Sequence, residues 1–215
     1  KNQDIGVIAM EPLRYDEPKN NFLKQVRKIA DEIGAVLIFD EVTIGWRLAN
    51  GGAHLKNGVR PDIAVFAKAI SNGFPMAAII GAKEVMQAAQ TTFISSTCWT
   101  DGIGPTAALA TIKKIINKKV TRHLDKIGKL IKRGLVKAAA SNKLNITVIG
   151  LPPLISFSFN YNKDSLAIRT LFTQEMLKRG ILAATGVDVS YSFGPKQVKK
   201  YLTAVNEVFG ILRRA

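Results

Sequence analysis

The sequence predicts an α/β protein with a mainly parallel sheet that has helices on both faces, followed by a smaller α/β domain. Two observations lead to this prediction: a strand, a helix and a second strand alternate near the start of the chain, and the predicted strands are continuous apolar runs. Parallel strands are joined through helices and are buried on both faces, so they are apolar throughout. With 47% hydrophobic residues among 215, the chain can form a packed core.

The first strand–helix–strand unit lies close to residue 1. Ile5 to Met10 is an apolar run that predicts a buried strand. A helix that Asn20 or Asn21 can cap extends to about Ile33, and Ala35 to Phe39 predicts the next strand. The side chains expected to form the buried face of this helix are Phe22, Val26, Ile29, Ala30 and Ile33.

Further elements complete the predicted sheet. A loop rich in Gly and Asn, residues 50–58, precedes a short strand at Ile63 to Phe66. A turn at Lys68 to Asn72 leads to another strand at Pro75 to Gly81. Pro105 then begins a long helix, because proline is favoured in the first helical turn.

We place a domain boundary in this long helix, so that residues 1–117 form one domain and residues 118–215 a smaller one. The organisation after the boundary differs, since helices and strands no longer alternate regularly. The expected elements are a basic helix at Thr121 to Ala140, strands at Asn145 to Ile149 and Leu154 to Phe159, a helix at Ser165 to Arg179, a strand at Ile181 to Ala184 and a helix at Pro195 to Leu212.

The net charge of +15 raises the possibility of an anionic partner. Many of the basic residues, however, recur every three or four positions on a helix, opposite an apolar stripe, which indicates a solvated face. No aromatic residues interleave with them, so we expect no nucleic acid partner. No apolar run is long enough to cross a bilayer. The basic positions are Arg122, Lys126, Lys129, Arg133 and Lys137, and the apolar ones are Leu124, Ile127, Ile131, Leu135 and Ala138.

The cysteine and histidine content gives little sign of metal or redox chemistry. Cys98 is the single cysteine, so no intramolecular disulfide can form and a cytoplasmic location is expected. His54 and His123 have no companions at metal-ligand spacing, and we expect both to be ordinary loop or surface residues rather than metal ligands.

Two residues follow predicted strands in positions suited to chemistry. Asp40 comes directly after a buried strand, where α/β sheets bind their ligands, although a carboxylate there can also cap the turn. Lys68 lies in a turn between apolar strands and is flanked by Ala67 and Ala69. Apolar surroundings disfavour its ammonium form and would favour a nucleophilic amine. The alternative is an exposed loop lysine.

Taken together, the segments around these residues resemble one enzyme family. Residues 61–78, PDIAVFAKAISNGFPMAA, resemble the cofactor-lysine signature of the class-III pyridoxal-phosphate aminotransferases. Residues 40–47, DEVTIGWR, resemble its cofactor-aspartate motif, with Ile44 as a departure, and Glu11-Pro12 resembles the pair on the preceding strand. The resemblance spans the chain and is nearest to the branch that contains glutamate-1-semialdehyde aminomutase.

This resemblance implies a fold-type-I pyridoxal-phosphate transferase. Residues 1–117 would be the C-terminal part of the cofactor-binding large domain and 118–215 the small C-terminal domain. Lys68 would hold the cofactor as a Schiff base and move the proton of the substrate carbon. Asp40 would pair with the pyridine nitrogen, and Val42, two residues further on, would pack on the ring.

A loop before the long helix is expected to bind the cofactor's phosphate. Hydroxyl groups and free backbone N–H groups suit an anion there. By resemblance Thr100, five positions before Pro105, reaches the phosphate of the neighbouring subunit, which implies a homodimer with shared active sites. Thr97 is the alternative, and Gly102 and Gly104 depart from the family's pattern. A plain Ser/Thr-rich loop is the competing interpretation.

The expected function is that of an aminotransferase or aminomutase that moves an amino group between small amino-donor and carbonyl substrates. We expect the chain to lack the N-terminal half of such an enzyme. Glu11 would face substrate charge or form a structural ion pair. The sequence leaves open the donor and acceptor, and the choice between transaminase and aminomutase. The alternatives are a non-catalytic relative that keeps the fold and a basic nucleic-acid-binding protein.

Overall fold

The computed structural model describes residues 5–214 and divides the chain into two compact units. The first unit ends at Thr121 and the second begins at Arg122. The division therefore falls inside helix α5 (Val120–Ser141), rather than between residues 117 and 118 as the sequence analysis placed it. Among the described residues, no helix combines the length and the apolar character that crossing a membrane requires.

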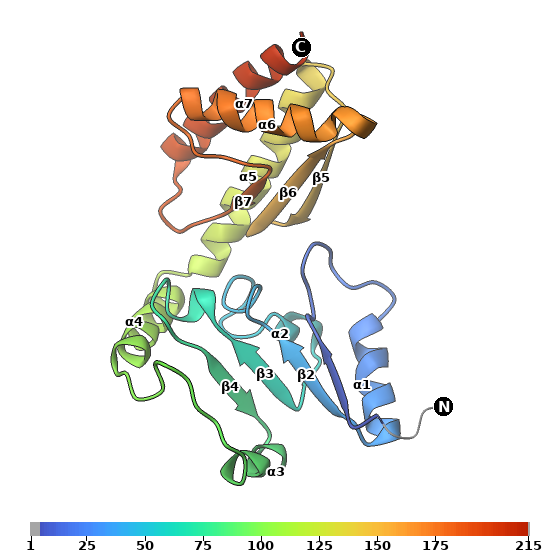
Figure 1. The fold of residues 1–215 in the computed structure, drawn as a ribbon, viewed down its shortest axis with the longest axis vertical. Coiled ribbons are helices and arrows are strands. Elements are labelled where there is room, and N and C mark those ends of the chain that lie inside the picture. Colours follow the sequence, from blue (N-terminus) through green and yellow to red (C-terminus); the bar gives the residue numbers. More distant parts are fainter. Residues whose placement is uncertain (1–4, 215) are drawn as a thin grey trace. The chain divides into compact units, whose positions relative to one another are not determined.

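The first unit is built on a four-stranded sheet in the order β1-β2-β3-β4 (Figure 1). Strands β1, β2 and β3 are parallel, and β4 pairs with β3 in antiparallel orientation, so the prediction of a mainly parallel sheet is confirmed. The last strand begins later than the predicted Pro75. The strands are β1 (Val7–Met10), β2 (Val36–Asp40), β3 (Ile63–Phe66) and β4 (Ala78–Gly81).

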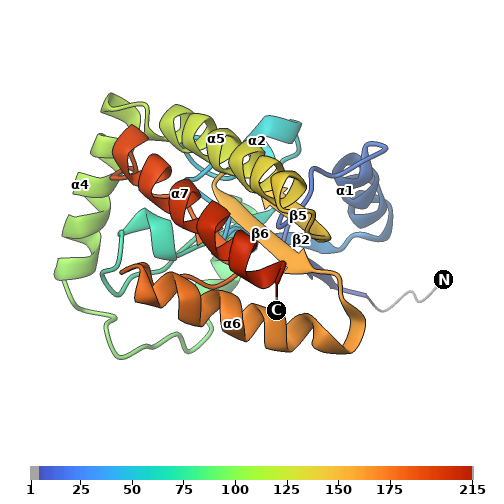
Figure 2. The ribbon, with the colours of Figure 1, turned by 90° about the horizontal axis from the view of Figure 1, so that it is seen from above.

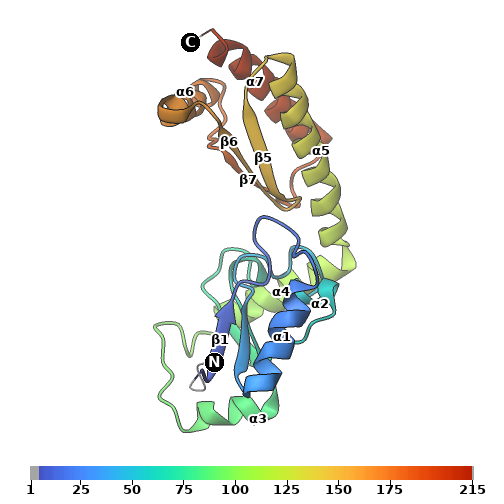
Figure 3. The same cartoon turned by 90° about the vertical axis from the view of Figure 1, so that its right-hand side faces the viewer.

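Helices connect these strands (Figures 1 and 3). The two longer ones pack on the same face of the sheet, where Leu37, Phe39, Ala64 and Phe66 are buried. The other face carries Val7 and Ile79, which are more than half exposed. The helical elements are α1 (Phe22–Ile33), α2 (His54–Asn57), η1 (Lys68–Ile70), α3 (Lys83–Met86), η2 (Gln87–Gln90) and α4 (Ile103–Asn117).

Helix α1 packs through only part of the predicted face, since Ala30 is buried and Val26 half-buried as expected but Phe22, Ile29 and Ile33 are not. Leu23 and Ala30 are its buried residues, whereas Phe22, Ile29 and Ile33 are 48%, 50% and 42% exposed. An ion pair lies on the packed side. Arg27, which lies between Leu23 and Ala30 in the helix, donates to the Asp62 carboxylate at 2.8 Å, and the same carboxylate oxygen accepts the Leu37 N–H.

The ends of α1 also differ from a side-chain-capped helix. Asn21, which directly precedes the first residue of the helix, has a left-handed φ of 56°. Its side chain makes no capping hydrogen bond. At the other end Gly34 adopts a φ of 71°, and its N–H bonds back to the carbonyls of the last turn. The glycine there has the conformational role that its position after the apolar pattern suggests.

The second unit has a three-stranded antiparallel sheet in the order β5-β6-β7. The strand predicted at Ile181 to Ala184 is wrong, because the chain joins the sheet only at Thr185, whose carbonyl accepts the Phe157 N–H. Leu182 is 89% exposed. The elements are β5 (Ile146–Leu151), β6 (Leu154–Phe159), η3 (Asn162–Asp164), α6 (Ser165–Lys178), β7 (Gly186–Asp188) and α7 (Pro195–Leu212).

The core of this unit lies between its sheet and its helices, with α7 running between α5 and α6 (Figure 2). Four phenylalanines meet there in tilted and edge-on contacts: Phe157, Phe159, Phe172 and Phe209. The amphipathic prediction for α5 is confirmed, since its predicted apolar stripe is buried and its five predicted basic residues are exposed.

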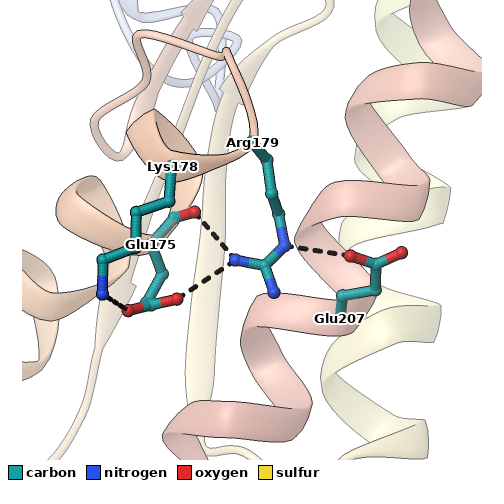
Figure 4. A network of polar contacts seen from close by, with 4 residues as sticks. All are labelled: Glu175, Lys178, Arg179 and Glu207. Carbon is teal, nitrogen blue, oxygen red and sulfur yellow. Dashed lines mark hydrogen bonds and ion pairs between the residues drawn. The ribbon is translucent and has the colours of Figure 1, made fainter.

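Ion pairs join the end of α6 to α7 (Figure 4). The Glu175 carboxylate is 8% exposed and accepts bonds from Lys178 at 2.5 Å and Arg179 at 3.1 Å, which together lower its pKa. The Arg179 guanidinium also donates to Glu207 at 2.9 Å. A buried carboxylate is tolerated here because both of its oxygens have cationic partners.

Candidate active site at the carboxyl edge of the parallel strands

Three residues singled out in the sequence meet at one edge of the first sheet. Glu11 directly follows β1, Asp40 is the last residue of β2, and Lys68 follows β3 after Ala67. Because these strands are parallel and in register, with Met10 beside Phe39 and Asp40 beside Val65, their carboxyl ends lie at the same edge. This is the edge at which α/β sheets bind ligands.

Asp40 both caps a turn and faces outward. Its Oδ1 accepts the Val42 N–H at 2.9 Å, which is the capping role considered from the sequence. The residue is exposed, and it lies on the sheet face that α1 and α4 leave uncovered. Capping therefore occupies one carboxylate oxygen, while the other is available for a ligand at the edge.

Lys68 has an unusual backbone and a defined side-chain partner. Its φ is 51°, in the left-handed region that non-glycine residues rarely adopt and that is often found at functional sites. Its Nζ donates to the Oγ1 of Thr43 at 3.0 Å. The side chain is exposed, which is the alternative that the sequence analysis left open for this lysine.

Thr43 is a residue that the sequence analysis missed. It lies half-buried in the loop after β2, and its hydroxyl group accepts the hydrogen bond from the Lys68 amine. A threonine in a loop carries no signal by itself. Only the fold brings positions 43 and 68 together, because they follow neighbouring parallel strands.

The same loop contains a buried carboxylate. Glu41 is 0% exposed and accepts hydrogen bonds from the N–H groups of Ala53 at 2.8 Å and His54 at 3.0 Å. The His54 ring completes the set, with Nδ1 at 2.7 Å from the carboxylate. The expectation that His54 is an ordinary loop or surface residue is therefore wrong. His123 is likewise bonded, through Nε2 to the Phe193 carbonyl at 2.8 Å.

Glu11 forms the ion pair that was one of its two predicted roles. Its Oε1 accepts a bond from Arg14 at 2.8 Å, and this carboxylate raises the pKa of the arginine. The Arg14 guanidinium also lies 5.4 Å from the centre of the Tyr15 ring. The second oxygen, Oε2, is buried and has no hydrogen-bond partner among the described residues.

The predicted phosphate loop lies apart from these contacts. Residues 91–100 are all exposed, and no hydrogen bond within residues 5–214 joins Thr97 or Thr100 to Asp40 or Lys68. Helix α4 begins at Ile103 rather than at Pro105, and its first N–H is accepted by Asp101 Oδ1 at 2.8 Å. The role of Thr100 at a phosphate stays a prediction.

A separate cavity of about 370 Å³ lies in the second unit. Its lining is mainly apolar and includes Ile131, Phe193 and Tyr201. The Tyr201 hydroxyl is buried without a hydrogen-bond partner among the described residues, and burial raises its pKa. None of the residues predicted to bind a cofactor or substrate lines this cavity.

Comparison with known proteins identifies relatives along most of the chain. The pattern of the class-III aminotransferases matches residues 11–212. Glutamate-1-semialdehyde 2,1-aminomutase of Nitrosopumilus maritimus is 36% identical over 167 residues, which are 74% of this chain and 38% of the relative. The enzyme of that name from Ignicoccus hospitalis is 30% identical over 232 residues, 99% of this chain and 55% of the relative.

Solved structures show the same fold. The pyridoxal-phosphate internal aldimine form of the FumI protein of Sphingopyxis sp. MTA144 matches with a TM-score of 0.92 at 24% identity, over 99% of this chain and 53% of that one. A transaminase with bound pyridoxal phosphate matches with a TM-score of 0.89 at 20% identity, over 99% and 53%. The chain thus spans about half the length, or less, of the relatives that it matches.

Proposed function

The chain belongs to the class-III aminotransferase family, whose cofactor is pyridoxal phosphate, and we propose that the protein containing it moves an amino group as an aminotransferase or aminomutase. The observation that carries this proposal is the pairing of a lysine and an aspartate at one sheet edge. The Lys68 amine donates a hydrogen bond to the Thr43 hydroxyl, and Asp40 is the last residue of the neighbouring strand.

The groups at this edge fit pyridoxal phosphate. The cofactor supplies an aldehyde that condenses with an amine and a ring that accepts electrons from a substrate carbon. Lys68 offers an exposed primary amine, and Asp40 an exposed carboxylate with one oxygen outside its turn. An amine and a carboxylate at the ends of neighbouring parallel strands are the groups that an aldehyde and a protonated pyridine nitrogen require.

Each residue then has a distinct task. The Lys68 amine would hold the cofactor and, once freed by a substrate amine, would take up and return the proton of the substrate carbon. The Asp40 carboxylate would keep the ring nitrogen protonated through a charge-assisted hydrogen bond. Val42, whose N–H is bonded to Asp40, would pack on the ring, and Glu11, whose Oε2 has no partner among the described residues, would lie near the charge of the substrate.

The substrates are a small amino donor and a carbonyl compound. Similar proteins include both aminomutases and a 3-aminobutyryl-CoA aminotransferase of Cloacimonas acidaminovorans, so the proposal extends to the reaction class and not to one donor. We further propose a cytoplasmic homodimer in which Thr100 reaches the phosphate in the neighbouring subunit. Its place in an exposed loop before α4 is compatible with a contact outside its own subunit.

The test uses full-length protein that contains this chain. Incubation with pyridoxal phosphate and reduction with borohydride should leave a phosphopyridoxyl group on Lys68, identified by peptide mass spectrometry. Lys68→Ala should abolish the label, whereas Lys83→Ala, which removes another exposed lysine of the first unit, should leave it unchanged. A label that persists on a different peptide in Lys68→Ala would remove Lys68 from the proposal.

A further inference from the structure

The loop from Glu41 to His54, here called the 41–54 loop, contacts both candidate chemical groups. Its Val42 N–H bonds to the Asp40 carboxylate at 2.9 Å, and its Thr43 hydroxyl accepts the Lys68 amine at 3.0 Å. The positions of the carboxylate and the amine therefore depend on how firmly this loop is held.

The loop is closed by the Glu41 carboxylate. Glu41 is fully buried, and it bonds to the N–H groups of Ala53 and His54 at the far end of the loop. Burying a carboxylate costs free energy unless hydrogen-bond donors surround it. The bonds from Ala53 and His54 offset this cost for Glu41 in the folded state. The first and last residues of the loop are consequently tied together.

His54 anchors the closed loop to the sheet. Its Nδ1 lies 2.7 Å from Glu41 Oε1, and because an ionised carboxylate only accepts, the ring donates through Nδ1. The ring centre lies 6.0 Å from that of Phe39, on the buried face of the sheet. Successive strand residues point to opposite faces, so this anchor lies on one side and Asp40 on the other.

Two glycines mark where the loop is most tightly packed. A Cβ at Gly52 would collide with the His54 ring and lie 2.9 Å from Glu41 Oε1. A Cβ at Gly45 would lie 2.7 Å from both the Glu41 carbonyl oxygen and Phe66 Cδ1. The loop is therefore packed too closely at these two positions to admit a side chain without displacing its neighbours.

We infer that Glu41 and His54 are positioning residues for the proposed active site. They fix the 41–54 loop, and the loop in turn sets Asp40 through Val42 and Lys68 through Thr43. The chemical consequence of this inference rests on the proposed function. The role differs from a general contribution to stability, because it predicts an effect on cofactor binding that other equally buried contacts do not have.

The experiment compares variants of the two histidines in full-length protein. His54→Ala removes the donor, and His54→Asn keeps an N–H group near the position of Nδ1. His123→Ala is the matched control, since it removes a part-buried histidine with a 2.8 Å bond in the second unit. The measurements are amide hydrogen exchange across the loop, the dissociation constant for pyridoxal phosphate, and the borohydride-fixed label on Lys68.

We expect His54→Ala to speed exchange across the 41–54 loop and to raise the dissociation constant roughly tenfold, because a charge-assisted bond to a buried carboxylate is lost. His54→Asn should recover most of the affinity, and His123→Ala should leave loop exchange and affinity unchanged. If His54→Ala does not fold, Gly52→Ala, which displaces the ring without removing it, serves as the test variant with the same expected loss.

The outcomes separate the two proposals. Wild-type protein that takes no label at Lys68 would refute the proposed function. Wild-type labelling together with unchanged affinity in a folded variant whose loop exchanges faster would refute the positioning role alone. Loss of affinity in His123→Ala equal to that in His54→Ala would also overturn it, because any buried contact would then have the same effect.

Discussion

The Nζ of Lys68 lies 3.0 Å from the Oγ1 of Thr43, a residue 25 positions earlier in the sequence. This bond joins the loop after β2 to the turn after β3. It gives the amine a fixed partner at an otherwise exposed edge. The first prediction concerns this contact.

Replacing Thr43 with Val should slow the borohydride-trapped labelling of Lys68 at limiting pyridoxal phosphate. A hydrogen bond typically contributes about 0.5–1.5 kcal/mol, so the rate should fall about twofold to tenfold. Thr43→Ser keeps the hydroxyl and should label at nearly the wild-type rate. Thr92→Val, which removes an exposed hydroxyl bonded to the Ala88 carbonyl, is the control. Equal rates for Thr43→Val and Thr43→Ser would exclude a role for the hydroxyl.

Asp40→Asn should leave part of the cofactor bound but slow the transamination half-reaction by about tenfold to a hundredfold, because a charge-assisted bond to the ring nitrogen is lost. The amide oxygen can still accept the Val42 N–H, so thermal unfolding should change little. Stopped-flow absorbance with an amino donor measures the rate. Near-normal rates would show that Asp40 does not act on the ring.

Subunits that carry Thr100→Ala and subunits that carry Lys68→Ala should complement each other when mixed. In the proposed homodimer, the site with an intact Lys68 receives Thr100 from the lysine-less partner, so each heterodimer has one native site. Activity should return under conditions that allow exchange of subunits, followed by native mass spectrometry. Exchange without recovery would place Thr100 within its own subunit or away from the phosphate.

The Asp62 carboxylate should stabilise the folded protein at neutral pH and lose this effect at strongly acidic pH. Partial burial pushes the pKa of Asp62 up, but the hydrogen bonds from the Leu37 N–H and from Arg27 outweigh it and hold the pKa below 3.8. A carboxyl whose pKa is lower in the folded state stabilises the fold above its unfolded pKa and loses this effect as the pH falls through the folded pKa.

Urea unfolding at a series of pH values checks this. The free energy of unfolding of the wild-type protein should begin to fall as the pH drops below about 4, and Asp62→Asn should be less stable at neutral pH with a flatter acid limb. If the free energy of unfolding falls equally steeply with decreasing pH in both proteins, Asp62 is not the group responsible.

The sequence predicted that Asp40 and Lys68 each follow an apolar strand, and both lie at the carboxyl ends of neighbouring parallel strands. Both follow short apolar runs, and apolar runs linked by a helix form parallel strands whose carboxyl ends coincide. The spacing of motif residues therefore carried information about the fold. Thr43 and His54 could not be found in this way, because their roles depend on partners that only folding brings near.

Helix α1 shows why an amphipathic pattern does not always identify the buried face. Phe22, Ile29 and Ile33 form one apolar stripe, yet the helix packs through Leu23 and Ala30. Arg27 lies on the packed face, and its ion-pair partner Asp62 lies 35 positions away in the sequence. Periodicity records which side chains are apolar, and it contains no information about such a distant ion pair.

The left-handed backbone at Lys68 implies a conflict between heat tolerance and chemistry. A lysine at a φ of 51° costs roughly 1–2 kcal/mol relative to its ordinary conformation, whereas asparagine accepts that region more readily. Lys68→Asn should therefore melt at a higher temperature than wild type while losing the amine. A population selected only for thermostability would drift away from lysine at this position, and selection for activity would restore it.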